Sequence, residues 1–268
     1  MSDFGLFAIS FFENRRRIFA MNNIDDRKVL EAARCIIFAL DVNSADEARE
    51  MVRKIPPSIS YVKVGLALIS AQEAGIVAKM LQAIGKEVFW DGKFADIPNT
   101  VAKATSNAAR FDVSMINVHA SSGMEAIKAA VANRGSSFIL GVTILTSIDE
   151  TECVSIFGNK PNAKVIQFAR MLLQADVHGI ICSPKEVELL GKYREFDKLL
   201  KITPGVRPEW ASAGDQKRVM TPREAIEAGA THLVIGRPIS SPPPEIGSPE
   251  KAAAMIIGEI AEALAQRR

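Results

Sequence analysis

Short apolar runs recur along the chain, and a longer segment with helical spacing follows each of them. Eight runs are rich in β-branched residues and short enough to be strands. Several are apolar at consecutive positions, which is typical of parallel strands covered by helices on their outer face. We therefore predict eight strands, at residues 35–41, 61–66, 87–91, 113–119, 138–145, 179–183, 198–204 and 231–236.

The intervening segments carry signals for helix starts. Ser44, three residues before Glu47, is a capping start for the first helix. Pro98, Pro184 and Pro222 lie where a first helical turn should begin, a position that tolerates proline. The other predicted helices cover residues 71–84, 98–110, 123–133, 163–174, 184–193, 222–228 and 249–266.

Eight alternating strand and helix units in about 230 residues predict an α/β fold, a single-domain (β/α)8 TIM barrel. An open, doubly wound sheet is the alternative. The glycine-rich fingerprints of dinucleotide and P-loop sites are missing after the early strands. We divide the chain into an N-terminal extension, 1–33, and a barrel domain, 34–268. The role of the extension stays open.

Composition narrows the class of protein. The 268 residues are 48% hydrophobic and 24% charged, with a formal net charge of +2. Without a strong basic field, and with only two Trp and two Tyr, a nucleic-acid partner is not expected. The apolar stretch from Phe4 to Phe12 precedes a basic cluster at residues 15–17, the reverse of a secretory signal. No run reaches the ~20 apolar residues of a membrane span.

The cysteines and histidines give weaker signals. Cys35, Cys153 and Cys182 are far apart and lack metal-ligand spacing, so we interpret them as reduced thiols of a cytoplasmic protein. His119 ends a predicted strand, where it could contact the site or serve packing. The other two histidines lie near strand starts and are interpreted as structural. No metal site is predicted.

Charged residues gather at the predicted strand ends. The first strand ends in Asp41, and the second carries Lys63 between two valines. If the valines face the helices, Lys63 faces the barrel interior. Asp91 and Lys93 are two residues apart, so their side chains share one face, with Cα atoms roughly 6.5 Å apart. Asp96 follows in the loop.

Function in a (β/α)8 barrel gathers at the C-terminal ends of the strands, so these five charged residues are expected near one mouth. Opposite charges this close favour both ionised forms, and an alternating network would hold Lys93 charged, as a general acid requires. Ordinary salt bridges are the other interpretation. Exposed pairs add little stability, so charge at this density favours a functional use.

The last two strands end in candidate anion-binding residues. Arg207 follows strand seven, and Gly236 with Arg237 follows strand eight. Loops after these strands often bind a phosphate in such barrels. Glycine lets backbone N–H groups approach an anion, and arginine adds a forked charged donor. We therefore predict a phosphate site here.

These motifs together resemble those of the orotidine 5'-phosphate decarboxylase family. Residues 91–100 resemble the family signature D-x-K-x-x-D-I-P-x-T. Supporting motifs follow in the family's order over roughly residues 35–260: A-L-D at 39–41, K-V-G at 63–65, N-V-H-A at 117–120, V-T-I-L-T-S at 142–147, T-P-G-V-R at 203–207, G-D-Q at 214–216 and G-R at 236–237. D-x-K-x-x-D alone is shared with sugar-phosphate relatives, and the I-P-x-T tail is more specific.

The resemblance implies decarboxylation of orotidine 5'-phosphate to uridine 5'-phosphate in pyrimidine synthesis. Lys93 would donate the proton that replaces CO2 at C6, after stabilising a C6 carbanion, while Asp91 and Lys63 complete the charged network. Asp96 would lie beside the substrate carboxylate. The family is a homodimer that uses neither cofactor nor metal, and in it the residues matching Asp96, Ile97 and Thr100 serve the neighbouring subunit's site.

The resemblance also implies the binding residues for the rest of the nucleotide. Asp41 and Lys63 would hold ribose hydroxyls. Thr146 would contact the base, and Pro204 would line its pocket. The phosphate end would be held by Arg207, Gln216, Gly236 and Arg237, and the loop 206–218 could close over it.

Two positions depart from the family pattern. Gly92 replaces a larger residue inside the signature, and serines at 121 and 122 stand where small apolar residues or glycine are common. Neither change removes a charged group. A sugar-phosphate decarboxylase or hexulose-phosphate synthase on the same barrel is the nearest alternative, and a barrel that binds phosphate ligands without catalysis is another.

Overall fold

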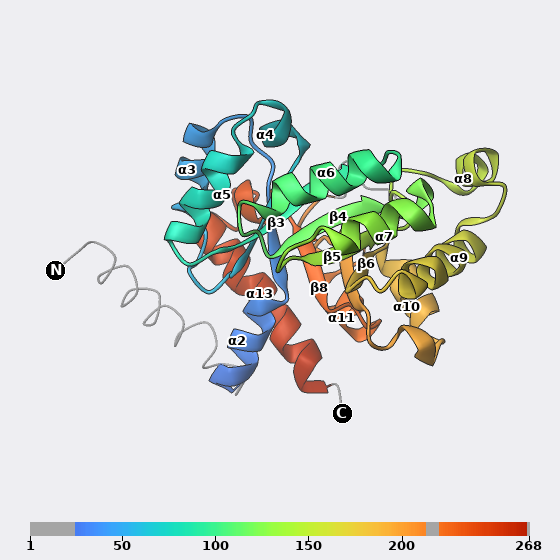
Figure 1. Ribbon diagram of the computed structural model, residues 1–268. Helices are drawn as coiled ribbons and strands as arrows, with labels where there is room; N and C mark the ends of the chain where they lie inside the picture. The colour runs from blue at the N-terminus through green and yellow to red at the C-terminus, as the bar shows by residue number, and fades with distance from the viewer. Residues whose placement is uncertain (1–24, 213–219, 267–268) are drawn as a thin grey trace.

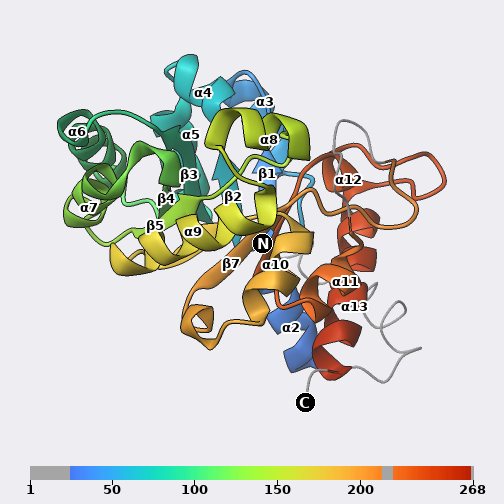
Figure 2. The same ribbon diagram turned by 90° about the vertical axis from the view of Figure 1, so that its right-hand side faces the viewer.

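The computed structural model describes residues 25–212 and 220–266. The extension is therefore described only from residue 25, and Gln216 lies outside the described residues. Eight parallel strands form one closed barrel in chain order, β1 to β8, and helices surround them (Figures 1 and 2). The predicted barrel is confirmed. The open sheet is excluded because β8 pairs with β1.

The strands are shorter than predicted at most ends, since residues near the turns leave the ladder. They are β1 (Ile36–Leu40), β2 (Tyr61–Val64), β3 (Glu87–Phe94), β4 (Met115–His119), β5 (Phe138–Val142), β6 (Gly179–Ile181), β7 (Leu200–Pro204) and β8 (His232–Ile235). The exception is β3, which was predicted to end at Asp91 and continues to Phe94.

The helices also match the predicted pattern, with some differences. They are α2 (Asp26–Arg34), α3 (Ala45–Val52), α4 (Leu66–Ser70), α5 (Ala74–Ala83), α6 (Pro98–Ala109), α7 (Met124–Ala132), α8 (Glu150–Phe157), α9 (Pro161–Gln174), α10 (Pro184–Gly191), α11 (Pro222–Glu227), α12 (Arg237–Ser240) and α13 (Pro249–Gln266), with short 3-10 turns at Ala120–Ser122 and Arg194–Phe196. The three prolines expected at helix starts are confirmed there.

The first described helix, α2, packs against the last one, α13. Val29, Ala32 and Ala33 are buried in the main core, and Asp25 caps the helix by accepting a hydrogen bond from the backbone N–H of Arg27. Residues 26–34 thus cover the outside of the barrel. Among the described residues, no helix combines the length and apolar character that crossing a membrane would need.

The core has two parts, as a barrel requires. Outward-facing strand residues pack against the helices in one large cluster, which includes Val62 and Val64. Inward-facing residues fill the barrel interior in a smaller cluster of Ile37, Phe89, Met115, Leu140 and Ile202. The interior is therefore packed solid at this level, and any site must lie nearer a barrel mouth.

Candidate active site

The inward-facing positions change from apolar to polar along three neighbouring strands. Phe89 on β3 and Met115 on β4 belong to the interior cluster. Two residues further along these strands, the inward positions hold Asp91 and Asn117, and β2 contributes Lys63. All three side chains are buried. Because strand side chains alternate between faces, this polar layer lies directly above the apolar one, toward the C-terminal mouth.

Charges of alternating sign form a continuous chain across this layer. Lys63 Nζ lies 2.9 Å from Asp41 Oδ1 and 3.2 Å from Asp91 Oδ2. Lys93 Nζ lies 2.7 Å from Asp91 Oδ1. The Asp41 side chain is 68% exposed and that of Lys93 32%, whereas those of Lys63 and Asp91 are 11% and 8% exposed. Both ends of this ion-paired series, Asp41 and Lys93, are therefore accessible to a ligand, whereas its two middle side chains are nearly buried.

Burial and charge act in opposite directions on the two middle groups. Burial works against the ionised form of Lys63, but the carboxylates of Asp91 and Asp41 outweigh it and raise the lysine pKa. Burial likewise opposes ionisation of Asp91, and Lys63, Lys93 and the Asn117 amide overcome it and lower the Asp91 pKa. Both groups therefore stay charged at neutral pH.

The structure confirms that Lys63 faces the barrel and that Asp91 and Lys93 share a face. Strand alternation is only part of the reason why Asp91 and Lys93 share a face. Lys93 has φ +46°, a left-handed conformation that is rare outside glycine. The ladder between β3 and β4 shifts register between Trp90 and Phe94. The strand predicted to end at Asp91 therefore continues through this irregularity to Phe94.

Asp96 lies outside the ion-paired chain. It is exposed, and its carboxylate accepts a hydrogen bond from the backbone N–H of Ile97 at 2.7 Å. Ile97 is 66% exposed, and Thr100 on α6 is exposed too. Within the described part of the chain, Asp96 makes no ion pair with Lys63 or Lys93. The structure thus brings together four of the five charged residues expected at the mouth.

The predicted phosphate residues lie at the ends of β7 and β8. Arg207 is half-buried, and its pKa is lowered by burial and by the neighbouring charge of Arg237. Arg237 begins α12 directly after Gly236. A Cβ atom at Gly236 would lie 3.7 Å from Asp41 Oδ2, so this end adjoins the first residue of the charged chain. Two arginines that influence each other electrostatically suit a ligand with more than one negative charge.

The remaining predicted binding residues border the same mouth. Pro204 is the half-buried last residue of β7, and Thr146 is half-buried in the connection from β5 to α8. His119, at the end of β4, is half-buried, and its pKa is lowered by burial and by the charge of Lys93. His119 therefore lies near enough to the charged chain to respond to it.

Sequence reasoning did not assign a role to Asn117. It is fully buried at 0% exposure, its amide nitrogen donates to Asp91 Oδ1 at 2.6 Å, and its Oδ1 accepts from the backbone N–H of Lys93 at 2.7 Å. The sequence could have predicted its position. Asn117 lies between Ile116 and Val118, which face the helices, so its amide faces the interior as Met115 does.

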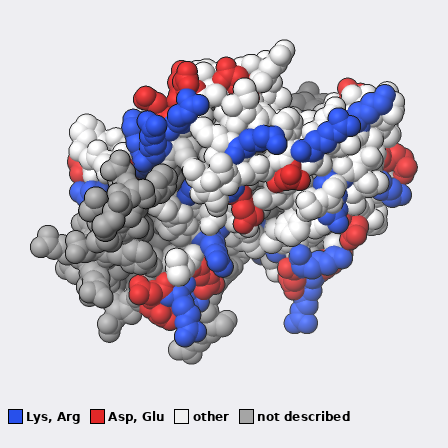
Figure 3. Space-filling model, turned by 60° about the vertical axis from the view of Figure 1, so that its left-hand side comes forward, with Lys and Arg blue, Asp and Glu red and all other residues white. Residues whose placement is uncertain are grey.

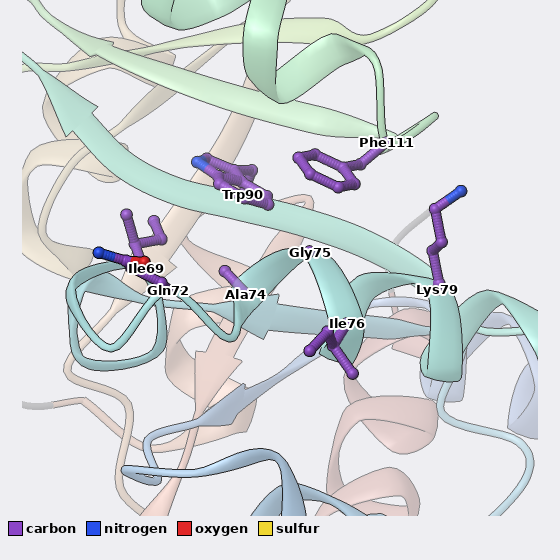
Figure 4. Close-up of a pocket in the computed structure, with 8 residues that line it drawn as sticks. All are labelled: Ile69, Gln72, Ala74, Gly75, Ile76, Lys79, Trp90 and Phe111. Atoms are coloured by element: carbon purple, nitrogen blue, oxygen red, sulfur yellow. The ribbon is translucent and has the colours of Figure 1, made fainter.

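A groove on the outside of the barrel differs in character from the charged mouth. This groove of about 380 Å³ is bordered by α4, α5, Trp90 of β3 and Phe111, and Figure 4 shows Trp90 beside Phe111. Their rings stack with centroids 5.4 Å apart. Lys79 is the one titratable side chain among the residues that line it. The outer face of β3 thus serves packing while its inner face carries the charges.

The surface shows no preference for one sign of charge on the face in Figure 3, where basic and acidic side chains are interspersed. This agrees with the net charge of +2.

Comparison with known proteins identifies relatives over most of the chain. A model of the "Orotidine 5'-phosphate decarboxylase / HUMPS family" matches residues 34–253. Orotidine 5'-phosphate decarboxylase of Geotalea daltonii is 41% identical over 238 residues, covering 86% of this chain and 97% of the relative. That of Heliobacterium modesticaldum is 38% identical over 249 residues, covering 89% and 100%.

A solved structure agrees with these relatives. The crystal structure of orotidine 5'-phosphate decarboxylase from Lactobacillus acidophilus superposes with a TM-score of 0.72 at 31% identity, and covers 85% of this chain and 99% of that one. The family match spans the whole barrel, including every strand that contributes to the charged chain. The protein therefore belongs to the orotidine 5'-phosphate decarboxylase / HUMPS family.

Proposed function

We propose that this chain is a carboxy-lyase that converts orotidine 5'-phosphate into uridine 5'-phosphate and CO2, a step of pyrimidine synthesis. The observation that carries the proposal is the alternating chain Asp41–Lys63–Asp91–Lys93 at the mouth of a barrel of this family. Its open end at Lys93 offers a fixed positive charge and a proton at the same atom.

The reaction needs both properties. When the bond between C6 and the carboxylate breaks, its electron pair stays on C6 and CO2 leaves. The Lys93 ammonium stabilises that pair electrostatically, which is worth most when the charge is held in place beforehand. It then transfers one proton from Nζ to C6, giving uridine 5'-phosphate and a neutral amine that regains its proton from solvent.

Asp91 gives Lys93 its orientation. Its Oδ1 accepts from Lys93 Nζ at 2.7 Å while its Oδ2 faces Lys63. Removing solvent from such a pair strengthens it, and the short distance limits the positions that Nζ can take. Asp41, at the other end of the charged series, and Lys63 beside it would hold the ribose hydroxyls.

We assign the phosphate to the β7 and β8 ends, where Arg207, Gly236 and Arg237 lie, with Gln216 as a further predicted contact. Binding energy gained at this non-reacting end can offset unfavourable contacts at the reacting end. Thr146 and Pro204 would contact the pyrimidine base between the two ends.

We also propose that the enzyme works as a homodimer in which Asp96, Ile97 and Thr100 complete the partner's site. The proposal is supported by their exposure: all three residues are exposed, and none of them belongs to the ion-paired series of their own subunit. An Asp96 carboxylate brought to about 4 Å from the substrate carboxylate would repel it by about 4 kcal/mol at an effective dielectric of about 20. That repulsion is relieved when CO2 leaves. We expect the dimer to be cytoplasmic.

The name of the matched family includes a second class of enzyme. The test must therefore distinguish decarboxylation of orotidine 5'-phosphate from activity on a hexulose phosphate. Purified protein is mixed with orotidine 5'-phosphate in EDTA, and the loss of its absorbance is followed. We expect turnover that EDTA does not reduce. A protein that leaves orotidine 5'-phosphate unchanged, or that acts on a hexulose 6-phosphate only when a divalent metal is supplied, would overturn the proposal in favour of the sugar-phosphate alternative.

A further inference from the structure

The irregular end of β3 places three residues, including Asp91 and Lys93, opposite one residue of β4. Trp90 pairs with Ile116, and the next pair is Phe94 with Val118. Residues 91–93 of β3 therefore all face the single residue Asn117. Extra residues on one strand leave backbone groups without ladder partners, which is a common way to redirect a side chain beside an active site.

The Asn117 side chain bridges this gap in the ladder. Its carbonyl oxygen accepts from the Lys93 backbone N–H at 2.7 Å, in place of a ladder acceptor. Its amide nitrogen donates to Asp91 Oδ1 at 2.6 Å. That same carboxylate oxygen accepts from Lys93 Nζ. The fully buried Asn117 amide thus contacts both members of the pair: Lys93 through its backbone N–H and Asp91 through its side-chain carboxylate.

The backbone of Lys93 needs such a hold. A non-glycine residue at φ +46° is disfavoured and persists only where its surroundings fix it. On the other side, the Phe94 ring lies over Gly92, where a Cβ atom would come within 2.7 Å of it. Asn117 thus contacts the left-handed residue itself, and Phe94 packs against the glycine that precedes it.

We propose that Asn117 is a positioning residue for the reaction: it fixes the left-handed backbone of Lys93 and the rotamer of Asp91, so that Nζ points at the reacting carbon. The proposal rests on the proposed function. A misplacement of about 1 Å can cost on the order of 100-fold in rate, so removing Asn117 should lower kcat by roughly that factor and leave KM within about threefold.

The informative variant is Asn117→Asp, which has nearly the same shape. In its ionised form the new carboxylate still accepts from the Lys93 N–H but cannot donate to Asp91, so kcat falls as the group loses its proton. Protonation of the new group at lower pH restores an O–H donor. The ratio of variant to wild-type kcat should therefore rise as the pH falls. Asn117→Ala has no donor to regain, and its ratio should stay flat.

Other titratable groups surround this position, and they are shared by both proteins. They are Asp91 and Lys93 on β3, Lys63 on β2, His119 on β4 and Asp41 after β1. Their effects on the pH profile largely cancel in the ratio of variant to wild type. A rising ratio in Asn117→Asp together with a flat ratio in Asn117→Ala therefore reports on the new carboxyl group.

A matched control separates positioning from stability. Ser137 is also buried, and its hydroxyl donates to the Val113 carbonyl at 2.6 Å near the other end of the barrel. Ser137→Ala should lower the melting temperature about as much as Asn117→Ala and leave kcat unchanged. If kcat of folded Asn117→Ala is within about threefold of wild type, or its loss matches that of Ser137→Ala, the proposal is wrong.

Amide hydrogen exchange tests the contact without any substitution. The Lys93 N–H lies at the open mouth, yet we expect it to exchange slowly because Asn117 holds it. Fast exchange would overturn the proposal even if the variants fail to fold. Wild-type turnover of orotidine 5'-phosphate is measured in the same series, so a failure of the proposed function is recognised separately from a failure of the Asn117 contact.

Discussion

The two halves of the barrel mouth present charge in different ways. On the β1–β4 side, Lys63 and Asp91 project from strands, are nearly buried and are held by several short contacts. On the β7–β8 side, Arg207 and Arg237 follow the strands and are more accessible. Groups on strands keep their geometry, whereas groups on loops can move with a ligand. We therefore propose that the β1–β4 side carries the chemistry and the β7–β8 side carries binding.

The first test of this division is Lys93→Ala. Loss of both the fixed charge and the proton donor should lower kcat by at least about 10⁴-fold. The melting temperature should stay close to that of wild type because the lysine is half-exposed. Turnover is followed by orotidine 5'-phosphate absorbance. Near-normal decarboxylation by this variant would contradict the assignment of the chemistry to the β1–β4 side.

The second test is on stability. Asp91→Ala removes the buried carboxylate that pairs with Lys63 and leaves the lysine buried. The variant should lower the free energy of unfolding by about 3 kcal/mol. Asp41→Ala is the matched control, because it removes the other partner of the same lysine. That partner is largely exposed, so the cost should be below about 1 kcal/mol. Urea unfolding measures both, and equal costs would contradict a buried, preorganised pair.

The third test is on the binding half. Arg237→Ala should raise KM by about 100-fold, the value of a charged hydrogen-bonded contact, and change kcat much less. Affinity for uridine 5'-phosphate should fall while affinity for uridine stays the same. Arg170→Ala, which removes an exposed pair with Glu195 on the outside of the barrel, is the control. A pure loss of kcat in Arg237→Ala would mean that the two halves are not separate.

The smallest expected effect lies at the opposite end of the barrel. Burial lowers the pKa of His232 to about 4, whereas the unfolded chain binds that proton near pH 6.5. The histidine stays neutral when folded, so stability is complete above about pH 6.5 and falls as the pH decreases toward 4. We expect a loss of about 2 kcal/mol between about pH 6.5 and about pH 4.5.

The His232→Gln variant should remove that part of the acid sensitivity, measured as urea unfolding at each pH. His178→Gln is a suitable comparison, because His178 is more exposed and also lies at a strand start. Activity at neutral pH should not change in either variant. If the pH dependence of unfolding is the same in His232→Gln as in wild type, the effect arises elsewhere.

Much of this molecule could be predicted from its sequence because the barrel repeats one simple pattern. Strand alternation predicted that Lys63 faces inward and that Asp91 and Lys93 share a face, and both were confirmed. The helix at Glu150–Phe157 was not predicted, since it lies within what was interpreted as a strand connection. The register shift between Trp90 and Phe94 could not be predicted, because alternation along one strand does not show how that strand pairs with its neighbour.

The position of Asp96 shows a different limit. Its place in the signature implies a role, but one chain leaves it exposed and outside the ion-paired cluster. A residue that serves a neighbouring subunit has no contact in its own chain from which the role could be read. Asp91 and Lys93 are therefore established as a pair by this structure, whereas the role of Asp96 stays a prediction that needs the dimer.

The central claim is that the β1–β4 side of the mouth stabilises negative charge at C6 of the substrate, beside the Lys93 ammonium group. Exchange of the C6 hydrogen of uridine 5'-phosphate for deuterium, followed by proton NMR in D2O, measures this directly, because the same carbanion forms in reverse. We predict exchange in the wild-type protein and none above buffer in Lys93→Ala. Equal exchange in both proteins would contradict the account.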